Sequence, residues 1–467
     1  EASINIREAE ERKEEFLNTF SEEISKILGK RKARSVIDQM RKHYSLSTTE
    51  HHGPITHPNS LNSVLLTAIP FLTDTEREKP GNVIVLSCAN ISFDNPRFPR
   101  GHLFTGEKNI TNQLVLFSRN ARPCPVVYFP PYDKESITSA LLRNDSWLKE
   151  GSVNEGVHEL VSKVLKNIYS KSKAFKFDNF SDQVSYTNFL LWQEIFSNKN
   201  QKNAPDLIYI EQEKIVIKLL KDYHLNKKTI VNSFLFDPNY HILIEKYFNN
   251  IQGAFSLKEK YGSFLFWALP KGKKYRIQLW RKEGRLVSED GLYQVRLTPK
   301  AIRKAIENKE LIPSTLLSFV MLAFYYGLNL RGGFDQTNYL TQMKDAFILM
   351  NKKLKNTLEI ENMLDVPTDG LSLIRPILAF LESKEGIKIP ATGLDFYLYS
   401  NENTLKIITE IAKKVTFEEA IYRALPSLYR AYCPQEYQQE ELLAITEEEI
   451  DELTGLKNKV TSFAKLG

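Results

Sequence analysis

The sequence has few cysteines and no long apolar run. Cys88, Cys124 and Cys433 lie far apart, so they support neither a disulfide framework nor a paired-cysteine metal clip, and a reducing compartment is favoured. The apolar stretch Leu316–Tyr326 is too short to span a bilayer and is interrupted by Ser318, so we interpret it as a buried helix. Residues 1–16 have no apolar segment typical of a signal peptide. We therefore expect a cytoplasmic protein with no membrane partner.

Several catalytic signatures are also missing. The chain has no GxxxxGK[ST] phosphate loop, no GxGxxG after a predicted strand, no GxSxG elbow and no HExxH. The net charge of +6 comes from 63 basic and 57 acidic residues, which is a small imbalance. The densest basic clusters, residues 30–34 and 271–285, are typical of solvated faces, so no nucleic-acid partner is expected.

The length points to one large domain with substantial insertions or to two domains. A chain of 467 residues exceeds the roughly 250–300 residues at which a single apolar core stops growing. Its 42% hydrophobic and 26% charged residues are typical of a globular protein. We expect a helical N-terminal segment over 1–45, an α/β core with insertions over 46–400, and a helical C-terminal segment over 401–467.

The predicted fold class is α/β, with a Rossmann-like mixed or parallel sheet core, helical insertions and a small antiparallel meander. Apolar, β-branched runs predict strands at 82–88, 113–119, 124–129, 206–210 and 229–236, with the meander at about 262–297. Helical periodicity predicts helices from 59 or 60 to 72 and at 133–143, 154–170, 182–197, 299–307, 313–328 and 334–354. Residues 45–62 favour no regular structure until the helix that follows them begins.

The first candidate site is HHGPITHPNSLN, where three histidines fall on an irregular segment before a helix. Imidazoles titrate near neutral pH, so His51, His52 and His57 are candidate proton-transfer groups or metal ligands. The helix start offers free N–H groups to an anion, which makes Thr56, Asn59 and Asn62 candidate substrate ligands. The alternative is a solvated loop in which the histidines cap or pack.

The second candidate site is the loop CANISFDNPRFPRG after the predicted strand 82–88. In open α/β sheets, ligands bind beyond the carboxyl ends of strands. Asp94 is a candidate catalytic carboxylate that could partner a histidine, and Arg97 and Arg100 are candidate clamps for a carboxylate or phosphate. The other candidate substrate ligands of this loop are Asn90, Ser92 and Asn95. The alternative is a structural turn with its arginines in water.

The third candidate site is RGGFDQTNYLTQMK at 331–344. The adjacent Gly332 and Gly333 permit close approach of backbone to a ligand, and the helix that follows places Gln336 and Tyr339 near its start. The alternative is a plain helix junction.

The order of these three segments resembles bacillithiol synthase, a family of cysteine-adding ligases. The third segment matches that family's GGPxExxYWxQ motif through Gly332, Gly333, Gln336, Tyr339 and Gln342, after a helix that contains Pro313. The family's paired glutamines are replaced by His51 and His52, and its acidic loop by CANISFDN. The resemblance implies a Rossmann-like core with a substrate canyon, in which cysteine is joined to a sugar-derived amine.

We therefore expect a ligase- or transferase-like enzyme that acts on a small polar metabolite, such as one that joins an amino acid to an amine- or sugar-containing acceptor. A first alternative is a metal-dependent enzyme in which His102 or Asp94 completes the cluster of His51, His52 and His57. A second is a non-catalytic binding protein on an enzyme-like fold. The sequence identifies neither a cofactor nor an oligomeric state.

Overall fold

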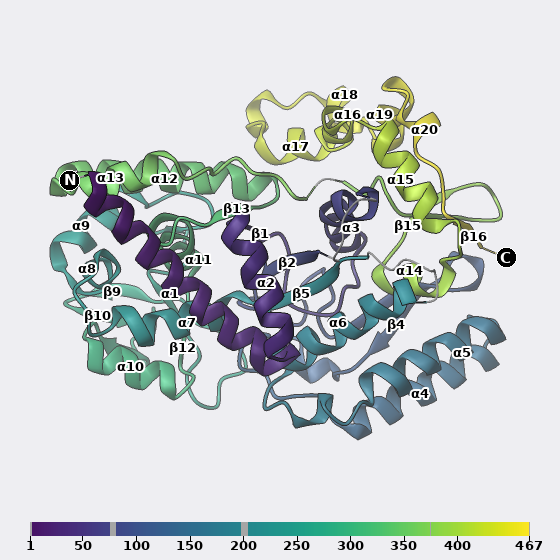
Figure 1. The fold of residues 1–467 in the computed structure, drawn as a ribbon, viewed down its shortest axis with the longest axis horizontal. Coiled ribbons are helices and arrows are strands. Elements are labelled where there is room, and N and C mark those ends of the chain that lie inside the picture. The colour runs from purple at the N-terminus through teal and green to yellow at the C-terminus, as the bar shows by residue number, and fades with distance from the viewer. Residues whose placement is uncertain (1, 75–80, 198–203, 374, 467) are drawn as a thin grey trace.

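The protein is a mixed α/β structure built around a parallel sheet (Figure 1). The computed structural model describes residues 2–74, 81–197, 204–373 and 375–466. Four parallel strands lie in the order β13-β1-β2-β5, with bounds β1 Ser45–Ser47, β2 Asn82–Ser87, β5 Asp206–Glu211 and β13 Asn329–Arg331. The predicted strands at 82–88 and 206–210 are therefore confirmed.

Helices cover both faces of this sheet. Ile84 and Leu86 of β2 belong to one buried cluster and Val83 and Val85 to another, as expected for side chains that alternate along a strand. The first cluster includes residues of α1 Ala2–Leu28, α2 Lys30–Lys42 and α7 Gln212–Leu219. The second includes residues of α3 Pro58–Thr73 and α6 Phe180–Ser197. Because β2 is buried along its whole length, its sequence is continuously apolar in the middle.

Two long insertions separate the strands of the sheet. Between β2 and β5 lie the hairpin β3 Gly101–Thr105 with β4 Thr111–Val115, and the helices α4 Lys134–Lys149 and α5 Glu155–Val164. Between β5 and β13 lie α8 Ile230–Phe236, α9 Pro238–Tyr247, β6 Phe255–Ser256, β7 Tyr261–Gly262, β8 Phe266–Ala268, β9 Trp280–Lys282, β10 Arg285–Val287, β11 Gln294–Arg296, α10 Pro299–Glu307, β12 Leu311–Pro313 and α11 Thr315–Phe319.

After β13 the chain is mainly helical. It forms α12 Phe334–Leu354, α13 Thr357–Leu364, β14 Phe380–Glu382, β15 Lys388–Pro390, α14 Gly393–Tyr399, α15 Thr404–Lys414, α16 Phe417–Tyr422, α17 Leu425–Tyr432, α18 Glu440–Ala444, α19 Glu447–Leu453, α20 Leu456–Lys459 and β16 Ala464–Lys465. Among the described residues, no helix combines the length and apolar character that a membrane crossing requires.

Three strand predictions were wrong or misplaced. Residues 230–236 form α8 because the Thr229 side chain accepts the Asn232 N–H at 3.1 Å and caps a helix, which buries Val231, Phe234 and Leu235 at helical spacing. Residues 124–129 form turns, in which the N–H groups of Val126 and Val127 donate to the loop after β2. The strand predicted at 113–119 is β4, which begins at Thr111 and ends at Val115.

Strands β1 and β13 of the parallel sheet were not predicted. Strand β1 lies within the segment predicted to be irregular, because it carries only one apolar side chain, Leu46, between two serines. The meander predicted at about 262–297 is present as the antiparallel sheet β9-β10-β11. Strand β8 lies within the same predicted range but pairs with β12.

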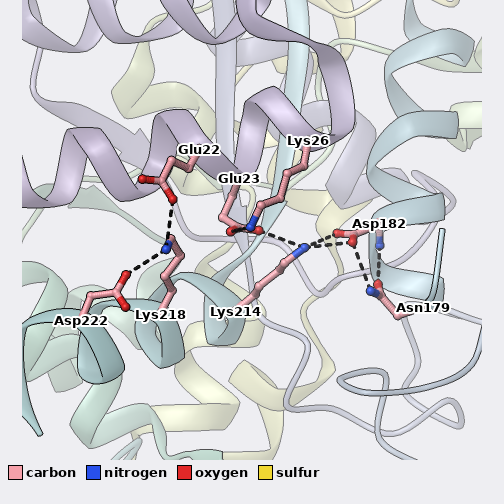
Figure 2. A network of polar contacts seen from close by, with 8 residues as sticks. All are labelled: Glu22, Glu23, Lys26, Asn179, Asp182, Lys214, Lys218 and Asp222. Atoms are coloured by element: carbon pink, nitrogen blue, oxygen red, sulfur yellow. Dashed lines mark hydrogen bonds and ion pairs between the residues drawn. The ribbon is translucent and has the colours of Figure 1, made fainter. Parts of the chain in front are cut away.

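A network of charges joins α1 to α6 and α7 (Figure 2). The Lys214 ammonium on α7 lies 3.0 Å from Glu23 Oε2 and 2.6 Å from Asp182 Oδ1. Lys218, one turn further along α7, lies 3.0 Å from Glu22 and 2.8 Å from Asp222. Since Glu23 is almost completely buried, Lys214 and Lys26, which lies 2.5 Å from Glu23 Oε1, together compensate a carboxylate that would otherwise be costly to bury.

Candidate functional site

A cavity of about 670 Å³ opens at the carboxyl edge of the parallel sheet. Every strand of that sheet delivers a residue to its wall from the position just beyond the strand end. These residues are Thr48 and Thr49 after β1, Cys88 and Asn90 after β2, Gln212 after β5 and Gly333 after β13. From β1 the chain adds β2 and then β5 on one side of β1, and it later adds β13 on the other side of β1. The strand order therefore reverses at β1. Ligands usually bind at such a reversal, at the carboxyl ends of the strands.

Insertions and the C-terminal helices close the other walls. Aromatic side chains come from Trp267, Phe319, Phe334 and Tyr339, and the guanidinium groups from Arg97, Arg276 and Arg375. Helix α17, near the C-terminal end of the chain (Figure 1), and the residue before it add Ala424, Ser427, Leu428, Ala431 and Tyr432. Asp335 also lines the cavity, where it accepts a hydrogen bond from the Tyr432 hydroxyl. The walls therefore combine apolar surface with an excess of positive charge.

The two segments first singled out in the sequence meet at this edge. The backbone of His51 forms a parallel bridge with Cys88, the His52 N–H donates to the Cys88 carbonyl at 2.8 Å, and the Cys88 N–H donates to the Glu50 carbonyl at 2.9 Å. Of the predicted site residues, seven line the cavity: His51, Asn59, Asn90, Arg97, Gly333, Gln336 and Tyr339. Nine do not: His52, Thr56, His57, Asn62, Ser92, Asp94, Asn95, Arg100 and Gly332.

His51 is the histidine of the first segment that reaches the cavity. Its Nδ1 lies 2.9 Å from Asn95 Oδ1, which also accepts the Arg97 N–H. The Asn95 oxygen is an acceptor, so the His51 proton is assigned to Nδ1 and Nε2 carries the lone pair. Burial lowers the pKa of His51, so the ring is neutral near pH 7. A neutral imidazole with a free ring-nitrogen lone pair can accept a proton from a ligand.

His52 is part of the core. Its Nδ1 lies 2.6 Å from Ser87 Oγ and its Nε2 3.0 Å from the Ser181 carbonyl, and the ring packs against Tyr209. Burial lowers the pKa of His52 to about 4. Both ring nitrogens have protein partners, so its contacts support a structural role.

His57 caps α3. Its Nδ1 accepts the Asn59 N–H at 3.2 Å and lies 2.9 Å from Arg97 Nη1. Burial and the adjacent Arg97 lower the pKa of His57 to about 4. The helix therefore begins one or two residues earlier than predicted, and His57 orients an arginine that lines the cavity.

Two further residues of this segment are bound to distant backbone. The Thr56 hydroxyl accepts the Leu103 N–H, and Asn62 Oδ1 accepts the N–H groups of Ile377 at 3.0 Å and Leu378 at 3.1 Å. These bonds join α3 and the segment before it to chain segments far away in the sequence.

The loop after β2 divides into a cavity-facing part and an exposed part. Arg276 donates to both the carbonyl and the side-chain oxygen of Asn90 and lies over the Trp267 ring at 4.3 Å. Asp94, by contrast, is exposed and accepts a hydrogen bond from Ser92. Arg100 lies over the Phe98 ring at 4.9 Å. Asp94 and Arg100 therefore occupy the outside of the loop.

The third segment supplies another part of the cavity wall. Gln336 lies in the first turn of α12 and forms two hydrogen bonds with the Thr48 side chain. The Thr48 hydroxyl donates to Gln336 Oε1 at 2.9 Å, and Gln336 Nε2 donates to Thr48 Oγ1 at 2.7 Å. The Gly332 N–H donates to the Gly370 carbonyl at 2.8 Å, and a Cβ on Gly332 would overlap the Gln336 side chain. Tyr339 is half-buried and packs against Phe319, and its ring fills the space where Gly253, at φ +84°, has no side chain. Gly332 thus makes room for Gln336.

Sequence reasoning gave no role to three groups in and behind the wall. The Cys88 thiol donates to Glu213 Oε1 at 3.3 Å, and Glu213 Oε2 accepts the Ala89 N–H at 2.7 Å. Burial and the Glu213 carboxylate raise the pKa of Cys88, and burial raises the pKa of Glu213. Glu213 could have been identified from its position just beyond strand β5, because the loop after β2 was selected for the same reason. Nothing in the sequence pattern indicated Arg276.

The metal-binding alternative finds no geometric support. Within the described ranges, no three His, Cys, Asp or Glu side chains are grouped so that they could hold a metal ion. His102, proposed to complete the cluster, is buried against Tyr169 and hydrogen-bonds its hydroxyl.

Comparison with models of known protein families and with curated protein sequences finds no match. The chemistry of the site is therefore inferred from its own geometry.

Proposed function

We propose that this protein is an enzyme of the transferase or ligase class that binds a small anionic metabolite in the cavity at the carboxyl edge of a Rossmann-like sheet. The observation that carries the proposal is the set of three guanidinium groups in a cavity to which all four parallel strands contribute. Arginine is suited to planar, bidentate recognition of carboxylate and phosphate.

The charge balance of the walls supports an anionic ligand. Arg375 is paired with Glu447 at 3.0 Å, and Asp335 is hydrogen-bonded to Tyr432. Among the described residues, Arg97 and Arg276 form no ion pair with a carboxylate. A bound anion would compensate these two charges. The aromatic walls offer contact to the less polar part of the same ligand.

The proposal assigns roles to the residues that reach the cavity. Arg97 and Arg276 hold the anionic group, His51 accepts or returns a proton, and Asn90, Gln336 and Tyr339 position the ligand. The resemblance noted in the sequence makes condensation of an amino acid with an amine- or sugar-containing acceptor the first reaction to test.

The test is a thermal-shift and calorimetric titration with amino acids, dicarboxylates and sugar phosphates, using wild-type protein, Arg276→Gln and Arg296→Gln. Arg296 is exposed on β11 and serves as the matched control. We expect at least one anionic compound to stabilise the wild type and Arg296→Gln, and to lose about tenfold or more in affinity with Arg276→Gln. Equal binding by all three proteins would contradict the proposal.

A further inference from the structure

We infer that Cys88 and Glu213 form a thiol–carboxylate pair that makes Cys88 a nucleophile toward an electrophilic carbon of an anionic ligand. This inference rests on the proposed function, because the ligand is the anion that the cavity binds. The product is a covalent adduct through Cys88 Sγ, from which the bound group can be passed to a second substrate.

The geometry provides a base for the thiol. Cys88 Sγ donates to Glu213 Oε1 at 3.3 Å, while the Ala89 N–H, at 2.7 Å from Oε2, holds the carboxylate in place. A nucleophile next to a base that a third group orients is the arrangement that nucleophilic catalysis requires. Glu213 is almost completely buried, so its proton affinity is increased, which suits a group that must take a proton from a thiol.

Cys88 also has a route to a ligand. The residue is partly exposed although it follows a fully buried strand, because its side chain lines the cavity. A thiol whose only role is packing would be expected within apolar side chains. Here the thiol is placed between a buried carboxylate and a cavity that contains three guanidinium groups.

The surroundings also favour the sulfur anion as it forms. The Asn90 backbone N–H and the Arg276 guanidinium both act to lower the pKa of the thiol, against the larger effect of burial and Glu213. Arg276 is held over Trp267 and bound to Asn90, so its charge stays close to Cys88. The resting state is therefore a neutral thiol, and ionisation accompanies attack on the ligand.

The proposed step balances as follows. The Cys88 proton moves to Glu213, the sulfur electron pair forms the bond to the ligand carbon, and the bond from that carbon to its leaving group breaks with its electrons on the leaving group. When an amine acceptor then attacks the same carbon, the C–S bond breaks with its electrons on sulfur. Glu213 returns its proton to the sulfur, and the amine loses a proton to water.

The test compares two alkylating reagents that model such a ligand, anionic iodoacetate and neutral iodoacetamide. The full-length protein is treated with each, and the rate of modification at each cysteine is measured by peptide mass spectrometry. Cys124 and Cys433 are partly exposed, lie outside the cavity lining and serve as controls in the same chain. We expect the ratio of the iodoacetate to the iodoacetamide rate to be about tenfold higher at Cys88 than at either control, because the cavity concentrates anions.

Two variants test the partners. Arg276→Gln should remove most of the iodoacetate preference, and Glu213→Gln should slow both reagents at Cys88 while the thermal midpoint shows a folded protein. The same reagent ratio at all three cysteines of the wild type would overturn the inference, as would an unchanged Cys88 rate in folded Glu213→Gln. If Glu213→Gln does not fold, the inference is tested by the ratios of the iodoacetate to the iodoacetamide rate at the three cysteines of the wild type. Anions that bind in the titration described above without a preference at Cys88 would contradict the inference and leave the proposed function standing.

Discussion

Gln336 and Thr48 form a hydrogen-bonded pair between residues 288 positions apart in the sequence. Thr48 lies just beyond β1 and Gln336 lies in the first turn of α12, so the pair joins two walls of the cavity. Both residues are buried or nearly so. The cavity is therefore assembled by tertiary contacts between distant segments.

We expect Gln336→Ala to weaken anion binding about tenfold while lowering the free energy of unfolding by only about 1 kcal/mol, the usual net contribution of one hydrogen bond. Urea unfolding and ligand titration check the two effects. Gln342→Ala is the matched control, because Gln342 lies about two turns further along α12, is exposed and is hydrogen-bonded to the neighbouring Asn338. An unchanged affinity in Gln336→Ala would show that this wall does not position the ligand.

We expect substitution of His51 to affect activity and substitution of His52 to affect stability. His51→Ala should abolish turnover and change stability little, since the ring lies at the cavity and has one side-chain partner. His52→Ala should lower the free energy of unfolding by about 3 kcal/mol, because it leaves a buried space and removes the hydrogen bonds to the Ser87 hydroxyl and the Ser181 carbonyl. Chemical denaturation of both variants measures this. Equal stability losses would contradict the division into a site histidine and a core histidine.

The buried histidines make stability depend on pH. Burial lowers the pKa of His102 to about 3, whereas an unfolded histidine titrates near 6.5. Between these values the unfolded chain binds the proton and the native chain does not, so this residue lowers stability as pH falls through 6.5 toward 3, with no penalty above 6.5. Its contribution is about 1.4 kcal/mol per pH unit.

Comparison of wild type with His102→Phe isolates this effect from groups that act in the opposite direction, such as Glu211, whose pKa burial raises to about 8. Urea unfolding at pH 7, 6 and 5 should show a shallower loss of stability in the variant. Parallel pH dependences for the two proteins would mean that His102 is protonated in the native state.

The charge network between α1, α6 and α7 should matter more at its buried end (Figure 2). Lys214→Met leaves the buried Glu23 with Lys26 as its ammonium partner and removes the ion pair to Asp182, so it should lower the free energy of unfolding by about 2 kcal/mol. Lys218→Met is the control one turn away, where Glu22 is exposed, and should cost less than about 1 kcal/mol. Urea unfolding of both variants measures the two stability losses. A larger loss in Lys218→Met than in Lys214→Met would contradict the prediction that the buried end of the network matters more.

The sequence predicted the helices and strands that have a clear local pattern of apolar residues. Strands β2 and β5 are apolar and β-branched, and α10 and α12 begin and end where periodicity predicted. Strands β1 and β13 escaped prediction because each is three residues long with one buried leucine, Leu46 and Leu330. Their pairing depends on contacts made only in the folded chain. The division into segments at 45 and 400 stays a prediction.

Site residues with a clear local signal in the sequence were also predicted, and those that depend on tertiary contacts were not. Loops after a strand or before a helix could be identified, so His51, Asn90 and Arg97 were found. Arg276 enters the cavity from an insertion, and the histidines of one short segment separate into a cavity residue, a core residue and a helix cap. Spacing alone cannot distinguish these positions, because burial and hydrogen-bond partners decide each role.

The most direct test of the account is to locate an anion bound by the protein. We propose to collect anomalous diffraction from crystals of the wild type and of Arg276→Gln grown with selenate, a tetrahedral dianion that arginine recognises. We expect a selenium peak inside the cavity beside Arg97 and Arg276 in the wild type, and none there in the variant. Peaks confined to exposed basic residues, such as Lys271 and Lys273, would contradict it.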